Sequence, residues 1–299
     1  MTFLDILTQQ LVNGLVLGSF YALVALGYTM IFGVIKLLNF AHGDLYMVGA
    51  YIGYLCMTHA GLGFFPSLLL SMAGCMLLGV LIEKIAYKPL RNAPRIAALI
   101  TAIGVSFFLE YFTALRFVFG ADFITYTRPF DVVVWDVWGV RITNITVIII
   151  GVTLLLLVLL QYVVNKTKVG TAMRATSLDK DAARLMGINV DGIISLTFAL
   201  GAALAGAAGV LYAIAFPQIF TFMGMMPGLK AFVAAVLGGI GNIAGAFIGS
   251  LLMGEIDVLV VSFVPAGSRL RDLFAFLVLI IVFLVKPTGI LGEPQVEKV

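Results

Sequence analysis

Long apolar runs separated by short polar breaks form the main pattern of this sequence. No charged residue occurs at positions 6–35 or 142–164, and a helix that crosses a bilayer needs about 20 apolar residues. The pattern predicts an all-α polytopic membrane protein with about eight transmembrane helices, some of them broken or re-entrant. The predicted apolar segments are 10–35, 39–57, 62–82, 96–117, 142–164, 193–216, a run ending near 264, and 273–285.

Composition supports a membrane protein over a soluble one. Hydrophobic residues make up 62% of the chain and charged residues 11%, whereas a soluble domain has about 25% charged residues. The alternating polarity of barrel strands is absent. Cys56 and Cys75 lie in apolar segments without a Cys-x-x-Cys spacing, so we expect membrane-packed thiols and no metal site. The first apolar run lacks a basic leader and a cleavage signal, which indicates a retained span.

The first polar break lies in Gly-Val-Ile-Lys-Leu-Leu-Asn-Phe-Ala-His-Gly-Asp-Leu-Tyr-Met-Val-Gly-Ala-Tyr, residues 33–51. Polar groups beside hydrocarbon are costly unless they face a cavity or a partner. The break is either an ordinary interfacial loop or an interrupted helix that lines a transport pathway. Under the second interpretation, the pathway residues are Asn39, His42, Gly43 and Asp44.

A second break follows the segment 229–239, which is too short to span a membrane. We predict a re-entrant half-helix here, with Gly238, Gly239, Gly241 and Asn242 as pathway candidates. The Gly-x-Gly-x-x-Ala spacing of 239–244 resembles a dinucleotide fingerprint, but its apolar context excludes that interpretation. Paired breaks suggest an inverted repeat of halves 1–141 and 142–299 within one transmembrane domain, 1–299.

One acid, Glu110, lies well inside an apolar run. We expect it to face the bundle interior, where it either lines the pathway or pairs with a neighbour such as Arg116. Pairing is the interpretation that we favour.

Loop charges indicate which side each connection faces. The segments 83–95 and 165–192 are strongly basic, and Arg269 and Arg271 follow a turn at 265–268, so we place all three inside. The segment 121–141, with Trp135 and Trp138, has no basic excess and predicts a small outer β-excursion. The N-terminus lies outside if 39–57 crosses the bilayer, and inside if that segment only dips into it.

The segment 165–192 is highly charged and must be solvent-exposed. It contains eight charged residues and the core Asp181-Ala182-Ala183-x-x-x-Gly187. This core resembles the Glu-Ala-Ala-x-x-x-Gly core of ABC importer permeases, with Asp in place of Glu. The later Ile-x-Leu-Pro element of that family is missing, because Thr-Phe-Ala-Leu stands at 197–200. Together with residues 33–51, 174–190 and 229–246, the core resembles the membrane permease subunit of branched-chain amino acid ABC importers over almost the full length.

The resemblance implies that 165–192 is a cytoplasmic coupling loop, whose short helix docks on an ATPase subunit. It also implies a sister permease, two ATP-binding subunits, an extracytoplasmic binding protein and a bacterial inner membrane. The chain has no Gly-x-x-x-x-Gly-Lys-[Ser/Thr] loop. We therefore expect a transporter subunit that binds no cofactor, with ATP bound by its partners. The expected coupling residues are Arg174, Asp179, Lys180, Asp181, Ala182, Ala183, Arg184 and Gly187. We expect the charged side chains to face a partner, Ala182 and Ala183 to keep that contact close, and Gly187 to end the segment.

Two other transport functions stay open at this point. Importers of urea and short amides share the same architecture. The sequence therefore indicates the type of transporter more firmly than its substrate. An ion-coupled secondary transporter would use His42, Asp44 and Glu110 as its coupling groups. A membrane-embedded enzyme has little support, because the two histidines belong to no metal-ligand or nucleophile motif.

Overall fold

Helices dominate the computed structural model, which describes residues 3–91, 93–137 and 139–292. Among them, six helices are long and apolar enough to cross a membrane, so the predicted fold class is confirmed, while the count of about eight is not. These helices are α1 (Phe3–Ile35), α3 (Phe64–Ile82, continued to Leu90), α4 (Arg95–Thr113), α5 (Asn144–Lys166), α8 (Val190–Ala215) and α10 (Ile243–Phe263).

Three further helices fall short of that standard for two different reasons. The helices α2 (His42–Tyr54) and α9 (Met225–Gly238) have 13 and 14 residues, which extend only about 20 Å at 1.5 Å per residue. The helix α11 (Gly267–Val285) has 19 residues, but Arg269, Arg271 and Asp272 interrupt its apolar character.

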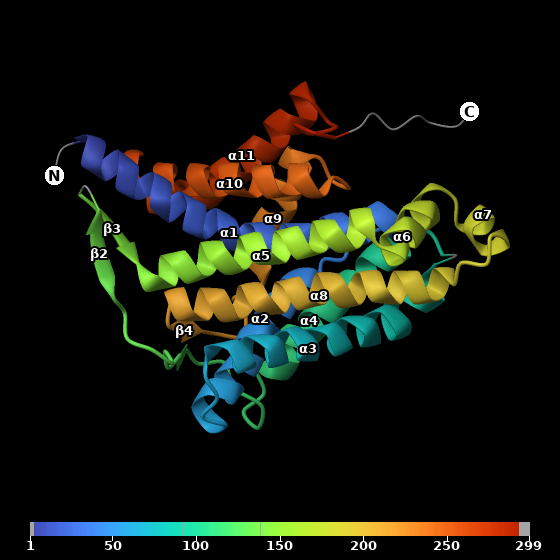
Figure 1. Ribbon diagram of the computed structural model, residues 1–299, viewed down its shortest axis with the longest axis horizontal. Helices are drawn as coiled ribbons and strands as arrows, with labels where there is room; N and C mark the ends of the chain where they lie inside the picture. The colour runs from blue at the N-terminus through green and yellow to red at the C-terminus, as the bar shows by residue number, and fades with distance from the viewer. Residues whose placement is uncertain (1–2, 92, 138, 293–299) are drawn as a thin grey trace.

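The two ends of the bundle differ in structure (Figure 1). One end, here called the outer end, carries the hairpin of β2 (Val134–Val137) and β3 (Val140–Thr143). The other, the inner end, carries α6 (Lys168–Leu178) and α7 (Lys180–Leu185). The start of α1 lies at the outer end, since the amide of Arg141 donates to Gln9 Oε1 at 2.8 Å. Basic loops face the cytoplasm, so the chain begins on the outside.

The predicted β-excursion is confirmed within the described residues, which exclude Trp138. In addition, β1 (Ile124–Thr125) pairs antiparallel with β4 (Gln218–Ile219), which follows α8. This pairing holds the excursion against the outer end of the bundle.

The placement of Arg269 and Arg271 on the inside is wrong. The rings of Phe3 and Phe263 lie 5.7 Å apart, so the turn between α10 and α11 lies at the outer end. Asp257 lies nearer to Phe263 than to the start of α10 at Ile243, so it belongs to the outer half of that helix. Arg271 forms an ion pair with buried Asp257, and a neutralised cation carries no information about the inside.

The helices α1 and α8 form the centre of the bundle, because 78% of each apolar window is buried. Small residues allow close approach between these helices and their neighbours. A Cβ atom added to Gly209 would lie 2.0 Å from the carbonyl oxygen of Tyr46, so α8 packs directly on the backbone of α2. Cys75 is buried as a free thiol beside Gly206, one turn before Gly209 on α8, as predicted.

Both predicted interruptions are present. The helix α1 ends at Ile35, Lys36 has a φ of 58°, and α2 begins six residues later at His42. The helix α9 ends at Gly238, and α10 begins after Gly239 and Gly241, whose φ values are 110° and 100°. Glycine adopts such conformations without steric cost, which explains why the chain turns here. The segment 228–241 is therefore not one continuous crossing helix.

Candidate coupling site and transport pathway

Side-chain caps define the helices at the inner end. Thr167 Oγ1 accepts a hydrogen bond from the amide of Gly170 at 3.2 Å and begins α6. Asp179 Oδ1 accepts from the amides of Asp181 and Ala182 at 2.9 and 3.0 Å and begins α7. A carboxylate at this position satisfies free amides and complements the helix dipole. Asp179 thus caps the start of α7, a role in addition to the coupling role that we predicted for it.

The end of α7 is as well defined as its start. Gly187 has a φ of 80°, and the amide of Ile188 donates to the carbonyl of Ala183 at 3.0 Å. This arrangement is a glycine-dependent helix stop. The prediction that Gly187 ends the segment is confirmed.

The predicted coupling residues do not all lie on one exposed face. Asp181 and Arg184 form an exposed ion pair of 3.1 Å, and Lys180 and Ala182 are exposed beside them. Partial burial, followed by the positive charges of Arg91 and Arg184, lowers the pKa of Lys180 below its ordinary value, with Asp181 acting in the opposite direction. This acidic and basic mixture would suit a charged partner surface.

Two of the predicted coupling residues face the protein instead. Ala183 is 3% exposed, so it cannot keep a partner contact close as we expected. The guanidinium of Arg174 donates to the carbonyl oxygen of Val164 near the end of α5, where cations are favoured by the helix dipole. Both residues thus hold α6 and α7 in place within the protein.

Sequence reasoning missed three large apolar side chains around α7. Leu178, Leu185 and Met186 are 84%, 89% and 82% exposed, in a segment that is otherwise highly charged. An exposed apolar group framed by charges is typical of a protein interface. The signal was present as bulky apolar residues on both sides of the Asp-Ala-Ala core.

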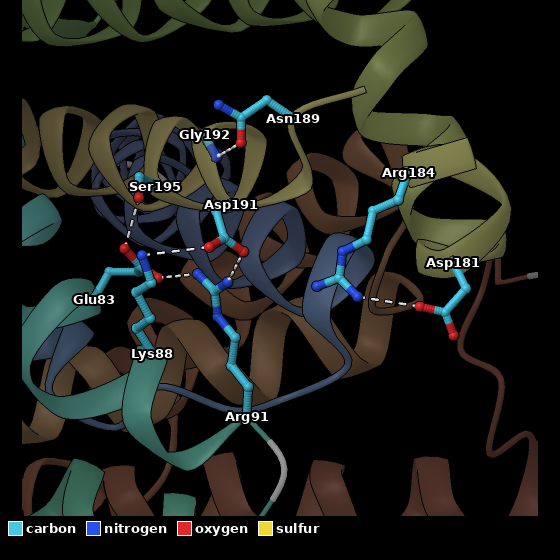
Figure 2. A network of polar contacts seen from close by, with 9 residues as sticks. All are labelled: Glu83, Lys88, Arg91, Asp181, Arg184, Asn189, Asp191, Gly192 and Ser195. Carbon is cyan, nitrogen blue, oxygen red and sulfur yellow. Dashed lines mark hydrogen bonds and ion pairs between the residues drawn. The ribbon is translucent and has the colours of Figure 1, made fainter. Parts of the chain in front are cut away.

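A polar network connects the end of α7 to the rest of the bundle (Figure 2). Asp191, in the first turn of α8, pairs with Lys88 at 3.3 Å and with Arg91 at 2.5 Å. Arg91 also pairs with Glu83, which accepts from Ser195 Oγ at 2.6 Å. Glu83, Lys88, Arg91, Asp191 and Ser195 are called the inner cluster below. It joins the segment 83–91 to α8, only a few residues after α7.

The pathway candidates on α2 are deeply buried. Asp44 is 1% exposed, and its Oδ2 accepts from Ser106 Oγ of α4 at 2.5 Å. Glu110 lies one turn further along α4 and is 3% exposed. The structure therefore brings Asp44 and Glu110 to one helix contact, through a serine that the sequence did not single out. Glu110 does not pair with Arg116, the neighbour considered from the sequence, since no ion pair joins them in the described chain and Glu110 Oε1 has no hydrogen-bond partner there.

The other candidates near the start of α2 contact different elements. Tyr87 donates to Asn39 Oδ1 at 2.8 Å, and the His42 ring lies edge-on to Tyr28 at 4.9 Å. A Cβ atom added to Gly43 would lie 2.7 Å from the carbonyl oxygen of Gly224. The beginning of α2 therefore packs against the beginning of α9.

The candidates at the second break lie at the opposite end of α9. The amide of Leu291 donates to the carbonyl of Gly238 at 2.9 Å, and Asn242 Nδ2 donates to the carbonyl of Leu291 at 3.0 Å. Asn242 Oδ1 also caps α10 by accepting from Gly245 at 2.9 Å. Gly238 and Asn242 thus hold the segment 289–292. Gly241 lies near the start of the first break, since a Cβ atom added to Gly33 would lie 3.9 Å from Gly241.

A second charged network lies inside the bundle and was also missed. Asp257 of α10 accepts from Tyr21 at 2.6 Å and pairs with Lys230 at 3.1 Å and Arg271 at 3.0 Å. Lys230 also pairs with Asp272 at 2.8 Å. These five residues are called the membrane cluster below. The available signal was that Lys230 is the only charged residue between Asp191 and Glu255, which marks a functional position in a membrane span.

Within the described residues, no group of three or more His, Cys, Asp or Glu side chains is arranged to hold a metal ion.

Comparison with known proteins identifies the family. The family described as "Branched-chain amino acid transport system / permease component" matches residues 10–283. The high-affinity branched-chain amino acid transport system permease protein LivH of Salmonella typhimurium is 41% identical over 97% of both chains, as is LivH of Escherichia coli K12. BraD of Pseudomonas aeruginosa, which carries the same description, is 42% identical over 97% of both chains. The chain therefore belongs to the family of branched-chain amino acid transport system permease components, which are multi-pass transport proteins of the membrane.

Proposed function

We propose that this chain is the permease subunit of an ABC importer that carries branched-chain amino acids across the bacterial inner membrane. Partner ATPase subunits supply the energy. The observation that carries the proposal is α7 at the inner end, a capped helix that exposes Leu185 and Met186 by 89% and 82%. Family membership gives the substrate class.

The geometry suggests how a docked partner would move the spans. Only a few residues separate α7 from α8, and α8 is among the most buried helices. Arg174 fastens α6 to the end of α5, and the inner cluster fastens α8 to the segment 83–91. A displacement of α7 would therefore be transmitted to the transmembrane helices α5 and α8 through short, rigid connections. Coupling between two conformational states of a transporter requires such connections.

The proposed complex contains a sister permease, two ATP-binding subunits and an extracytoplasmic binding protein. The helices α3, α4 and α5 have only 33%, 28% and 22% of their apolar windows buried, which leaves faces for lipid and the sister permease. We place the pathway along Asp44, Ser106 and Glu110, where the interrupted helix α2 meets α4. The two interruptions also support the division into halves 1–141 and 142–299.

The docking role of α7 is tested with the double variant Leu185→Asp, Met186→Asp. Two carboxylates remove the apolar contact and add charges that a docked interface would have to desolvate. We expect loss of the ATPase subunits from complexes purified through a tag on this chain, together with loss of ATP-driven leucine uptake.

The matched control is Lys168→Asp, in the first turn of α6, where an acid suits the helix dipole and Lys168 is exposed away from α7. The control should keep both the ATPase subunits and uptake. Retention of both by the double variant would contradict the docking role.

A further inference from the structure

A cavity lies in the outer half of the bundle, away from α7. Its volume is about 800 Å³, and α1, α9, α10 and α11 contribute to its wall. It extends towards Gln10 and Asn13, near the outer start of α1. Small-molecule sites have volumes of about 300–1,000 Å³, so an amino acid fits with water to spare.

One wall of this cavity is charged, and its charges balance. Lys230, Asp257, Arg271 and Asp272 of the membrane cluster all line it, giving two cations and two anions. The side chains of Lys230 and Asp257 are 4% and 0% exposed, whereas those of Arg271 and Asp272 are 35% and 50% exposed. The buried pair supports the outer pair, which is open to the cavity.

Another part of the lining is apolar. It consists of Phe20 of α1, Phe220 and Met223 from the link before α9, and Met226 in the first turn of α9. Methionine side chains adapt their shape to apolar ligands. The cavity thus combines a charged wall holding both signs with an adaptable apolar wall.

This combination matches one chemical class of ligand. A zwitterionic amino acid with an aliphatic side chain carries a carboxylate, an ammonium group and an apolar branch. A guanidinium binds a carboxylate through parallel hydrogen bonds, and a carboxylate accepts from an ammonium group. A simple cation or anion would leave half of the charged wall unused.

We propose that this cavity is an amino-acid binding site on the outer half of the transport route. Arg271 binds the substrate carboxylate, Asp272 binds its ammonium group, and Phe20, Phe220 and the methionines enclose its side chain. Lys230 and Asp257 are positioning residues, because they hold the outer pair without contacting the ligand. The proposal deepens the proposed function and rests on it.

Protection of an engineered thiol tests the site directly. Ser268 is exposed and lines the cavity, so Ser268→Cys would react with a charged thiol reagent. Cys56 is replaced by Ser, while Cys75 is buried and stays. In the assembled complex, leucine should slow labelling, whereas leucinol, which lacks the carboxylate, and urea should not.

Asp272→Asn, introduced into the complex that carries Ser268→Cys, distinguishes a ligand-binding role of Asp272 from a purely structural one. It leaves the contacts among Tyr21, Lys230, Asp257 and Arg271 in place but removes the anion that Asp272 offers to Lys230, so labelling is compared well below the melting temperature measured for this variant. Protection by leucine should weaken about tenfold or more, because a hydrogen bond between two charged groups is lost. Asp131→Asn, at an exposed acid outside the cavity, is the control and should leave protection intact.

The outcomes are distinguishable. Equal labelling with and without leucine, in a complex that still takes up leucine with ATP, would overturn the site and leave the proposed function standing. Full protection in Asp272→Asn would overturn the assigned role of Asp272. If the complex takes up no leucine even without substitutions, the proposed function is contradicted, and so is the assignment of an amino acid as the ligand of this cavity.

Discussion

The inner cluster and the membrane cluster use similar residues in different surroundings. Each connects helices far apart in the sequence: the inner cluster joins Arg91 to Asp191, and the membrane cluster joins Tyr21 to Asp257 and Arg271. In the inner cluster, Lys88 and Asp191 are 51% and 45% exposed. In the membrane cluster, Lys230 and Asp257 are 4% and 0% exposed.

The difference in exposure changes what each cluster can do. Exposed ion pairs stabilise a fold by about 0–1 kcal/mol, since water screens them and they can be exchanged cheaply. A buried charge is costly once its partner is removed. The exposed pair of Lys88 and Asp191 can therefore be exchanged at little cost, while Arg91 and the buried Glu83 keep the segment 83–91 on α8. The buried pair of Lys230 and Asp257 is suited to stay fixed.

The largest effect on stability is expected for Asp257→Ala. This change removes the anion shared by Arg271 and the buried Lys230, and leaves Lys230 with only the half-exposed Asp272, which costs about 3–5 kcal/mol of unfolding free energy. Thermal unfolding of the purified protein in detergent measures it, with the exposed Asp131→Ala as control. A loss equal to that of the control would show that the membrane cluster is no more important than a surface charge.

Arg91→Ala tests the buried part of the inner cluster. Glu83 has a fully buried side chain and would keep only its bond from Ser195, so we expect a loss of about 1–3 kcal/mol. Arg116→Ala, at an exposed arginine, should have almost no effect in the same unfolding assay. Indistinguishable results for the two arginines would mean that Arg91 does not hold the segment 83–91 to α8.

Gly187→Ala tests the glycine stop of α7. Alanine at a φ of 80° costs about 1 kcal/mol or more relative to glycine. The effect should be local, so hydrogen exchange at the amide of Ile188 should accelerate while the core of α8 stays protected. The control is Gly104→Ala on α4, where an added Cβ meets no atom and helix propensity improves. Unchanged exchange at Ile188 would contradict the described stop.

Lys88→Ala should have the smallest effect of the four. Its pair with Asp191 is half exposed, and Arg91 would still hold Asp191, so we expect a loss of at most about 1 kcal/mol. The loss should shrink further at high salt, because exposed charges are screened. A large, salt-independent loss would place Lys88 in a buried network and remove the contrast between the clusters.

Local signals in the sequence predicted the breaks and the coupling segment. Gly239 and Gly241 end a segment too short to span, and the observed positive φ values explain why glycine is needed there. The charges of 165–192 indicated a solvent-exposed segment, and Gly187 indicated where its short helix ends. These features depend on residues close together in the chain.

Features that depend on tertiary contacts were missed or misplaced. Lys230 and Asp257 are 27 positions apart and meet only when α9 packs on α10. Arg271 was interpreted as a cytoplasmic charge, because nothing local shows that its anion is buried. Arg174 was expected to face a partner, yet it binds the end of α5. Sequence patterns identify polar residues in a membrane protein, but their partners are set by packing.

ATP-driven uptake in a sealed, reconstituted system tests the central claim most directly. The complete complex is placed in proteoliposomes with ATP on the α7 side, the binding protein on the hairpin side, and ionophores that dissipate ion gradients. We predict that labelled leucine accumulates only with ATP, and that unlabelled valine competes while urea does not. Leucine uptake that follows an imposed ion gradient and ignores ATP would contradict the account.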